Sequence, residues 1–323
     1  MRSRLVSGLP RRQLESVDLA TDHAGLPPSL IAAIEAEGGL WRASDGYTTP
    51  TEIVERALEV GAVALRLDVR DLSFLSDLPG IRYLHLRSDG RPPLDPIGSL
   101  RDLRALILEV GAVRGSLDPL AFPELRWLRI KLGGKGGAAA FASLQRGHPG
   151  LRWLAVGETR IRSVEALVSG LPSLTNVSIH FADFLRELGD LASVTPELEA
   201  IRLDFTGIRS LAGLEALQRL TIVDLTGGDV TDLGPVGRSQ GLRYARLLAP
   251  DASSIETLRR HPNLRMLGLQ LDRQPPLDVI DSMPELVAVW RGHHFEGPIH
   301  QVDLSEVPLE HPLRREWHEA MRQ

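Results

Sequence analysis

Apolar residues recur along most of the chain in one short pattern with a nearly constant period. In its clearest copy, residues 198–203 (LEAIRL), the first, fourth and sixth positions are apolar and the others are mostly polar or small. Successive copies begin 22 to 26 residues apart, after a weaker copy at residues 62–67. This period indicates an array of stacked repeats. The full copies begin at Ile81, Leu103, Leu125, Leu151, Leu174, Leu198, Leu220, Leu242, Leu264 and Leu286.

Each repeat predicts a short strand followed by a return leg. In the strand, the first, fourth and sixth residues of the pattern face the core, and alternation sends the residues between them to the opposite face. The return leg adds apolar residues such as Ile208, Leu211 and Leu214. Two longer copies predict helical return legs over residues 138–145 and 182–191. Because one repeat cannot bury its apolar side alone, stacked repeats should share one continuous core.

The segments before and after the array lack the period and predict helical caps. The pattern predicts helices over residues 27–37 and 50–60, the second with Thr51 as its N-cap. We expect both helices to shield the open first edge of the array, since terminal repeats need a polar outer cover. The expected organisation is a helical N-terminal cap (residues 1–60), the repeat array (residues 61–292) and a C-terminal cap (residues 293–323) that closes with a helix.

The repeated phrase resembles the leucine-rich repeat family, and its 22-residue spacing is similar to the short-repeat, internalin-like class. The resemblance implies an α/β fold, a curved horseshoe solenoid of about 11 repeats with a parallel β-sheet on its concave side. In that family the concave sheet usually binds a protein or peptide. The array covers about 230 of the 323 residues.

One position departs from the family pattern. The family often has Asn eight residues after the first leucine, where its side chain bonds neighbouring backbone. This chain has no Asn there, so the backbone groups must be only partly satisfied or use Thr, Asp and water, and we expect a less regular curvature. The positions hold Asp89, Thr159, Thr206, Gly228, Pro250 and Asp272.

The outward strand positions are rich in residue types that dominate binding hot spots. Three of the five Trp and two of the three Tyr fall in this set, although aromatic residues make up only 5% of the chain. Trp, Tyr and Arg are over-represented at hot spots, so these positions are the candidate partner-binding residues. They are Arg66, Tyr83, His85, Trp127, Arg129, Trp153, His180, Arg202, Asp224, Tyr244, Arg246 and Trp290.

Aromatic residues in this set share one column, which can be read in two ways. Trp127 and Trp153 stand on adjacent strands with Tyr83 in the same column, either as a stacked structural pair or as an exposed hydrophobic anchor. His180 stands beside Asp204 and is a candidate pH-sensitive contact.

Charged residues in the set form two further columns. The columns Asp68, Arg87, Glu109, Lys131 and Arg202, Asp224, Arg246 alternate in sign and predict internal ion-pair ladders. This pairing would leave Arg66, His85 and Arg129 as an unpaired cationic group suited to an acidic partner or a C-terminal carboxylate.

The composition and net charge of the chain disfavour some kinds of partner and cellular location. The net charge of −5 argues against nucleic acid, whose binding depends on cationic neutralisation of phosphates. The chain has no Cys, no signal peptide and no apolar run of membrane-spanning length, which favours a soluble cytoplasmic protein.

Basic residues are 35 Arg and 2 Lys, which is typical of a high-GC bacterial genome. His293, His294 and His300 lack an ordered metal-ligand spacing.

We find no P-loop, nucleophile elbow or zinc-protease motif, so no catalytic residue, cofactor or metal is expected. The leading hypothesis is a non-catalytic, monomeric module that binds a protein or peptide on its concave face, as a regulator or inhibitor. Two alternatives stay open: a sensor of small molecules or peptides, and an accessory subunit of an enzyme complex. An exposed aromatic patch can also bind a second copy of the chain.

Overall fold

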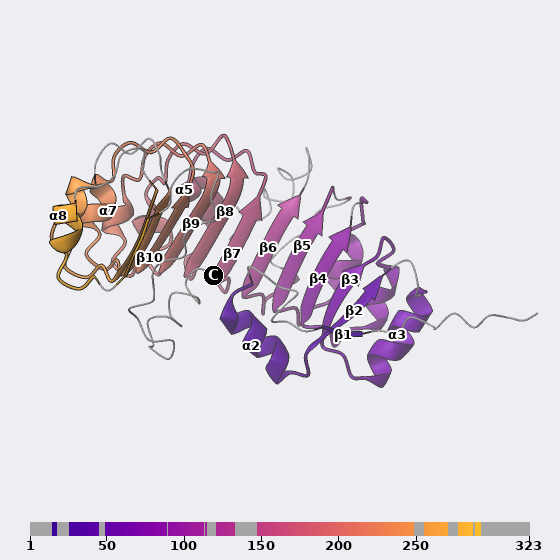
Figure 1. Ribbon diagram of the computed structural model, residues 1–323. Coiled ribbons are helices and arrows are strands. Elements are labelled where there is room, and N and C mark those ends of the chain that lie inside the picture. Colours follow the sequence, from indigo (N-terminus) through magenta and orange to yellow (C-terminus); the bar gives the residue numbers. More distant parts are fainter. Residues whose placement is uncertain are drawn as a thin grey trace, which may run out of the picture.

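The computed structural model describes residues 15–17, 26–44, 49–88, 90–112, 114, 121–132, 147–248, 255–270, 277–286 and 288–291. The described strands form one 13-stranded sheet in chain order, and Figure 1 shows them side by side. β1 (Glu15–Val17) pairs antiparallel with β2 (Leu40–Ser44), and from β2 onward each strand runs parallel to the next. The others are β3 (Ala64–Asp68), β4 (Tyr83–Ser88), β5 (Ala105–Val110), β6 (Trp127–Leu132), β7 (Trp153–Gly157), β8 (Asn176–Ala182), β9 (Ala200–Thr206), β10 (Ile222–Thr226), β11 (Tyr244–Leu248), β12 (Met266–Gln270) and β13 (Ala288–Arg291).

The main core fills the space between the sheet and the return legs. It is a continuous cluster of buried side chains that reaches from Ala43 to Met283. The predicted inward positions are confirmed: Leu103 and Leu220 are fully buried, as are the return-leg residues Ile208 and Leu214. Burying one such side chain contributes about 1.5–3 kcal/mol, so the repeats stabilise one another through this shared core.

In the described part of the array, the return legs contain short turns of helix. Four are 3₁₀ turns, η1 (Ser73–Asp77), η2 (Asp95–Ser99), η6 (Leu214–Ala216) and η7 (Glu256–Leu258), and four are brief α-helices, α5 (Val164–Val168), α6 (Leu191–Val194), α7 (Gly234–Arg238) and α8 (Leu277–Asp281).

One predicted helical return leg is wrong. Residues 182–190 form no helix: the chain turns at residues 183 and 184, and Glu187 then forms parallel bridges with Ser163 and Ser210. Gly189, at φ 76°, stands outside the helical region, so the helix begins only at Leu191. The other predicted helix, over residues 138–145, and the C-terminal cap lie outside the described residues.

The second N-terminal helix, α3 (Pro50–Glu59), is a convex leg that joins β2 to β3. Its N-cap is Thr49 rather than the predicted Thr51, because Thr49 and Glu52 form a capping box: Glu52 N–H donates to Thr49 Oγ1 and Thr49 N–H donates to the Glu52 carboxylate. α3 buries Ile53 and Ala57 in the main core. The parallel sheet therefore already includes β2, before residue 61.

The first helix, α2 (Pro28–Ala36), ends before Gly38 and Gly39 and packs on the face of the sheet opposite the main core, here called the concave face (Figure 1). The sequence predicted that this helix shields the first edge of the array, and for α2 that prediction is wrong. Its apolar side forms a second cluster with the first residues of the strands, and β1 pairs with the β2 edge instead. The cluster contains Leu26, Leu30, Ile34, Leu40, Ala64, Tyr83, Ala105 and Ile107, with Trp127 packed against it.

Glu37, the residue that follows α2, ties the helix to the sheet. Its carboxylate accepts hydrogen bonds from Arg82 Nη1 at 2.6 Å, Arg104 Nη1 at 2.7 Å and Tyr83 Oη at 2.8 Å. Burial raises the pKa of Glu37, but the hydrogen bonds from Arg82 and Tyr83 and the charges of Arg104 and Arg82 outweigh it, so the pKa is lowered. We call β3 to β6 the helix-covered half of the concave face and β7 to β11 the second half.

Candidate binding surface on the concave face

The register of the parallel strands arranges the outward residues in three rows. The first row contains Tyr83, Ala105, Trp127, Trp153 and Asn176 on successive strands. The second row contains Arg129, Ala155, Ser178, Arg202, Asp224 and Arg246, and the third contains Glu109, Lys131, Gly157, His180 and Asp204. The predicted neighbours Trp127 and Trp153, and Arg202, Asp224 and Arg246, are confirmed.

Most of the predicted aromatic column is buried rather than exposed. Tyr83 is 2% exposed beneath α2, Trp153 is 3% exposed and Tyr244 is also buried, whereas Trp127 is half-buried against the α2 cluster. Large side chains on strands about 4.8 Å apart shield one another. Sequence alternation gives the face of the sheet on which a side chain lies but cannot show that a distant helix covers that face. Trp290 lies on β13 opposite Gly268, and its side chain lies outside the described part.

In the helix-covered half, the cations expected to be unpaired have carboxylate partners. His85 Nε2 and Arg129 Nη2 each lie 3.4 Å from a Glu109 carboxylate oxygen, and Arg66 Nε lies 3.9 Å from Asp68 Oδ1. The prediction of a free cationic group is therefore wrong. His85 and Arg129 reach diagonally across the strands to Glu109, and Arg66 pairs with Asp68 two residues along the same strand, whereas the prediction considered only residues directly opposite.

Glu109 is the most perturbed carboxyl of this half. The hydrogen bond from His85 lowers its pKa, and the charges of Arg129, His85 and Arg87 add to that effect against the opposing effect of burial. The result is a pKa of about 2 instead of 4.5. Glu109 is therefore a fixed negative charge at neutral pH.

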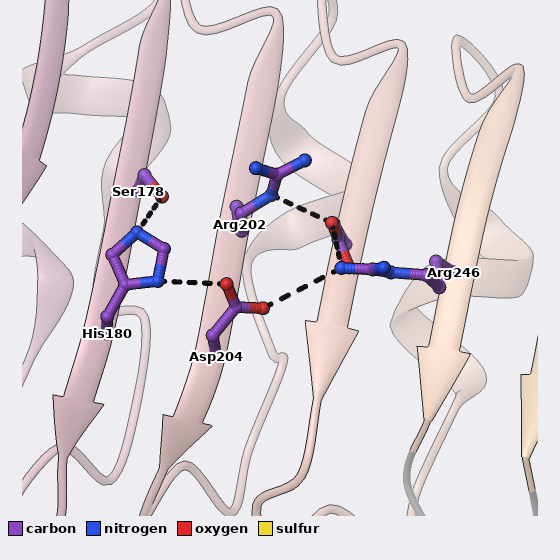
Figure 2. A network of polar contacts seen from close by, with 6 residues as sticks. Ser178, His180, Arg202, Asp204 and Arg246 are labelled. Carbon is purple, nitrogen blue, oxygen red and sulfur yellow. Dashed lines mark hydrogen bonds and ion pairs between the residues drawn. The ribbon is translucent and has the colours of Figure 1, made fainter. Parts of the chain in front are cut away.

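In the second half, a connected polar network spans β8 to β11, and Figure 2 shows most of its members. Its centre is Asp224, which is only 1% exposed. Arg202 Nε donates to Asp224 Oδ2 at 2.8 Å, and Arg246 donates through Nε at 2.6 Å and through Nη2 at 2.7 Å. The predicted ladder is confirmed here, with the bidentate geometry that makes Arg–carboxylate pairs strong.

The network continues through His180. His180 Nδ1 lies 2.9 Å from Asp204 Oδ2, its Nε2 lies 2.8 Å from Ser178 Oγ, and Arg246 Nη2 lies 3.9 Å from Asp204 Oδ1 (Figure 2). Burial raises the pKa of Asp204, but the hydrogen bond from His180 and the charges of His180, Arg202 and Arg246 outweigh it, so the pKa is lowered. Sequence analysis missed Ser178, although its place two residues before His180 on one strand is a usable signal.

Ser178, His180 and Asp204 are hydrogen-bonded in the same sequence as a Ser–His–Asp triad. They lack the accessible serine and the free backbone N–H groups of such a triad. Because a carboxylate only accepts, His180 must carry its proton on Nδ1, and a neutral ring then accepts from Ser178. Ser178 is buried in the middle of β8, between β7 and β9 in register, where backbone N–H groups serve the ladder rather than a developing oxyanion. The three side chains therefore order the surface and do not form a hydrolytic centre.

Several cavities open on the concave face of the described chain, and two of them bear on binding. The larger, about 370 Å³, lies where α2 begins and is lined by Pro27 and Ser29 of the helix segment and by Trp127, Trp153 and Ile222 of the sheet, among others. The smaller, about 110 Å³, lies between Arg129, Lys131, His180 and Phe181 over Gly157. Both border the second half.

At the carboxyl ends of β8 and β9, two phenylalanines project into solvent. Phe181 and Phe205 are 52% and 48% exposed, and their rings stack with centroids 5.5 Å apart and an interplanar angle of 4°. Both have a positive φ, 53° and 50°, which costs a non-glycine residue about 1 kcal/mol or more. Sequence analysis did not select them. A usable signal was their place in the repeat. The equivalent position after β10 is Gly227, and glycine there indicates a positive φ.

Comparison with known proteins bears on the fold alone. No protein-family model and no curated protein sequence matches the chain. Among solved structures, the chain is similar to an internalin (inlF) from Listeria monocytogenes, with 19% sequence identity, coverage of 73% of this chain and 68% of that chain, and a TM-score of 0.54. It is also similar to a chain of the Toll–Spatzle complex from Drosophila, with 15% identity, coverage of 76% of this chain and 35% of that chain, and a TM-score of 0.55.

The fold is a curved leucine-rich repeat solenoid. This finding confirms the fold class expected from the sequence. At one of the positions where the family has asparagine, the buried Thr206 Oγ1 has no hydrogen-bond partner in the described part of the chain. Thr206 therefore does not replace the asparagine side chain in bonding neighbouring backbone.

The described ranges of the solenoid contain no group of three or more His, Asp or Glu side chains placed to hold a metal ion. They also contain no helix of sufficient length and apolar character to span a membrane.

Proposed function

We propose that the chain is a non-catalytic binding module that holds a protein or peptide segment against the second half of the concave face, next to the start of α2. The observation that carries this proposal is the 370 Å³ cavity between α2 and the sheet, beside a polar network that is ordered before any partner arrives. Side chains already held in one geometry lose little entropy on binding. Trp127, Arg129, His180, Arg202 and Arg246 are the predicted residues with exposed atoms at this surface.

The finer form of the proposal is a cytoplasmic, monomeric bacterial protein that regulates or inhibits its partner. The absence of Cys and the Arg-rich, Lys-poor composition support the compartment and the source. A net charge of −5 favours a protein partner over nucleic acid. An enzyme with this chain as accessory subunit would be one such partner.

The test is affinity capture from native-host lysate with wild type and an Ile222→Arg variant, which places a long cation in the cavity. Leu58→Arg is the matched control, because Leu58 is 63% exposed on α3, away from the concave face. We expect a protein that is captured by wild type and by Leu58→Arg but lost with Ile222→Arg, with similar melting temperatures for all three. Equal capture by all three would contradict the proposal.

A second function, small-molecule sensing, has support from the size of the same cavity, since ligand pockets usually measure about 300–1,000 Å³. Mass spectrometry of the purified protein under native and denaturing conditions separates the two functions. A compound that is released on denaturation and is absent from Ile222→Arg would favour the sensor. An unliganded protein that captures a protein partner would favour the binding module.

A further inference from the structure

The stacked phenylalanines, here called the rim pair (Phe181 and Phe205), form a contiguous apolar surface at the carboxyl ends of β8 and β9. Single exposed apolar residues are common, but joined ones mark interaction sites. Of the four exposed large apolar side chains in the described residues, two form this stack and a third, Phe184, follows on the same turn. The rim pair borders the 110 Å³ pocket, because Phe181 is one of its walls.

The backbone at the rim pair does not call for phenylalanine. Both residues have a positive φ, a conformation that glycine adopts more easily, and Gly227 does so at the equivalent position of β10 with φ 74°. A Cβ built at Gly227 would lie 3.6 Å from Phe205 Cδ1, an ordinary van der Waals contact, so the backbone conformation rather than lack of space favours glycine there. Folding alone would favour glycine at all three positions, so the rings need another reason.

The pocket beside the rim pair is cationic. Arg129 and Lys131 line it, and Gly157 forms its floor, where an added Cβ would lie 3.3 Å from Lys131 Cγ. Arg129 shares Glu109 with His85, whereas the exposed Lys131 forms no ion pair with a described residue. The exposed Glu158 directly follows Gly157, and its charge opposes a second carboxylate nearby. A carboxylate would therefore bind toward Lys131 and away from Glu158.

We infer that the rim pair and Lys131 together bind a peptide segment of the partner protein in which a carboxylate stands next to an apolar side chain. The apolar group packs on Phe181 and Phe205, and the carboxylate enters the pocket toward Lys131. This inference rests on the proposed function and names the chemistry of its partner. The carboxylate comes either from an Asp or Glu side chain or from a chain terminus.

The test is a selection from two phage libraries of short random peptides, one internal and one with free carboxyl ends, on the intact chain. Counter-selection uses Phe181→Gly/Phe205→Gly, a double variant that removes the rings and relieves the positive φ, so it should fold at least as well as wild type. Peptides kept by wild type and rejected by the double variant should carry an acid next to an apolar residue. Amidated and Asn- or Gln-substituted versions then distinguish a terminal from a side-chain carboxylate.

Two single variants test the charge, and a third is the control. Lys131→Glu should weaken binding of the selected peptides by about tenfold or more, in the range of a hot-spot loss. Glu158→Gln should tighten it, and Leu58→Ala, an exposed apolar residue on α3, should leave it unchanged. A selection that yields no peptide dependent on the rim pair, or peptides that bind Lys131→Glu as tightly as wild type, would overturn the inference. Capture that depends on Ile222 but not on the rim pair would overturn it while leaving the proposed function intact.

Discussion

The two halves of the concave face use similar residues for different purposes. In the helix-covered half, α2 lies on the first row, and the carboxylate of Glu37 bonds Arg82, Arg104 and Tyr83. In the second half, arginines instead bond carboxylates of the sheet itself, around Asp224. Besides the ion pairs of Glu109 within its own sheet, the helix-covered half thus bonds a segment of its own chain, whereas the second half holds its polar groups ordered within the surface.

The helix-covered half also shows what this sheet can bind. An amphipathic segment lays Leu30 and Ile34 on the first row and ends in a carboxylate held by cations. That combination of apolar side chains and one acid is the chemistry inferred for the partner of the second half. Substitutions of the polar groups in each half separately test whether the two halves differ in this way.

The largest effect is expected at the centre of the second half. Asp224→Ala would leave Arg202 and Arg246 without their buried partner, and breaking a buried pair costs about 3–5 kcal/mol. Urea denaturation measures the loss. The control is Asp229→Ala, whose ion pair with Arg209 is exposed and should matter by less than about 1 kcal/mol. Similar losses for both variants would mean that the network does not hold the second half together.

In the helix-covered half, the next largest effect is pH dependence through Glu109. Its pKa falls from 4.5 to about 2 on folding, so the unfolded chain binds the proton more readily. The stabilisation is complete above pH 4.5 and is lost as pH falls toward 2, by an amount on the order of 3 kcal/mol. Glu109→Gln should flatten the dependence of the unfolding free energy on pH in that window. An unchanged slope would show that His85 and Arg129 do not stabilise the charged form.

A smaller effect should distinguish α2 from the second half. Glu37→Gln removes a charge that receives three hydrogen bonds and should cost about 1–2 kcal/mol. Hydrogen exchange should speed up in α2 and stay unchanged in β9 and β10, while the exposed Glu35→Gln leaves both unchanged. Faster exchange throughout the sheet would show that α2 is an integral part of the solenoid rather than a separately docked segment.

Features that repeat with the period of the array could be predicted from the sequence. Contacts with segments distant in the chain could not. The inward residues, the register and the ladder Arg202–Asp224–Arg246 follow from local alternation, because each strand repeats the last. The burial of Tyr83 depends on α2, which is far from it in the chain, and no local pattern contains that contact. The diagonal pairs of Glu109 and the stack of Phe181 on Phe205 depend on side-chain reach and a positive φ, which alternation does not encode.

The missing asparagine ladder leads to the smallest predicted effect, and it concerns the second half. Thr206 lies eight residues after Leu198, and its buried hydroxyl has no partner in the described chain. Thr206→Val keeps the shape and removes that hydroxyl, so it should stabilise the protein by about 1 kcal/mol. Thr195→Val is the matched control: Thr195 is equally buried but donates to Leu191 O at 3.2 Å, so its replacement should destabilise by a similar amount. Thermal unfolding of the two variants should therefore shift in opposite directions, and a loss of stability in both would mean that Thr206 has a bonded partner after all.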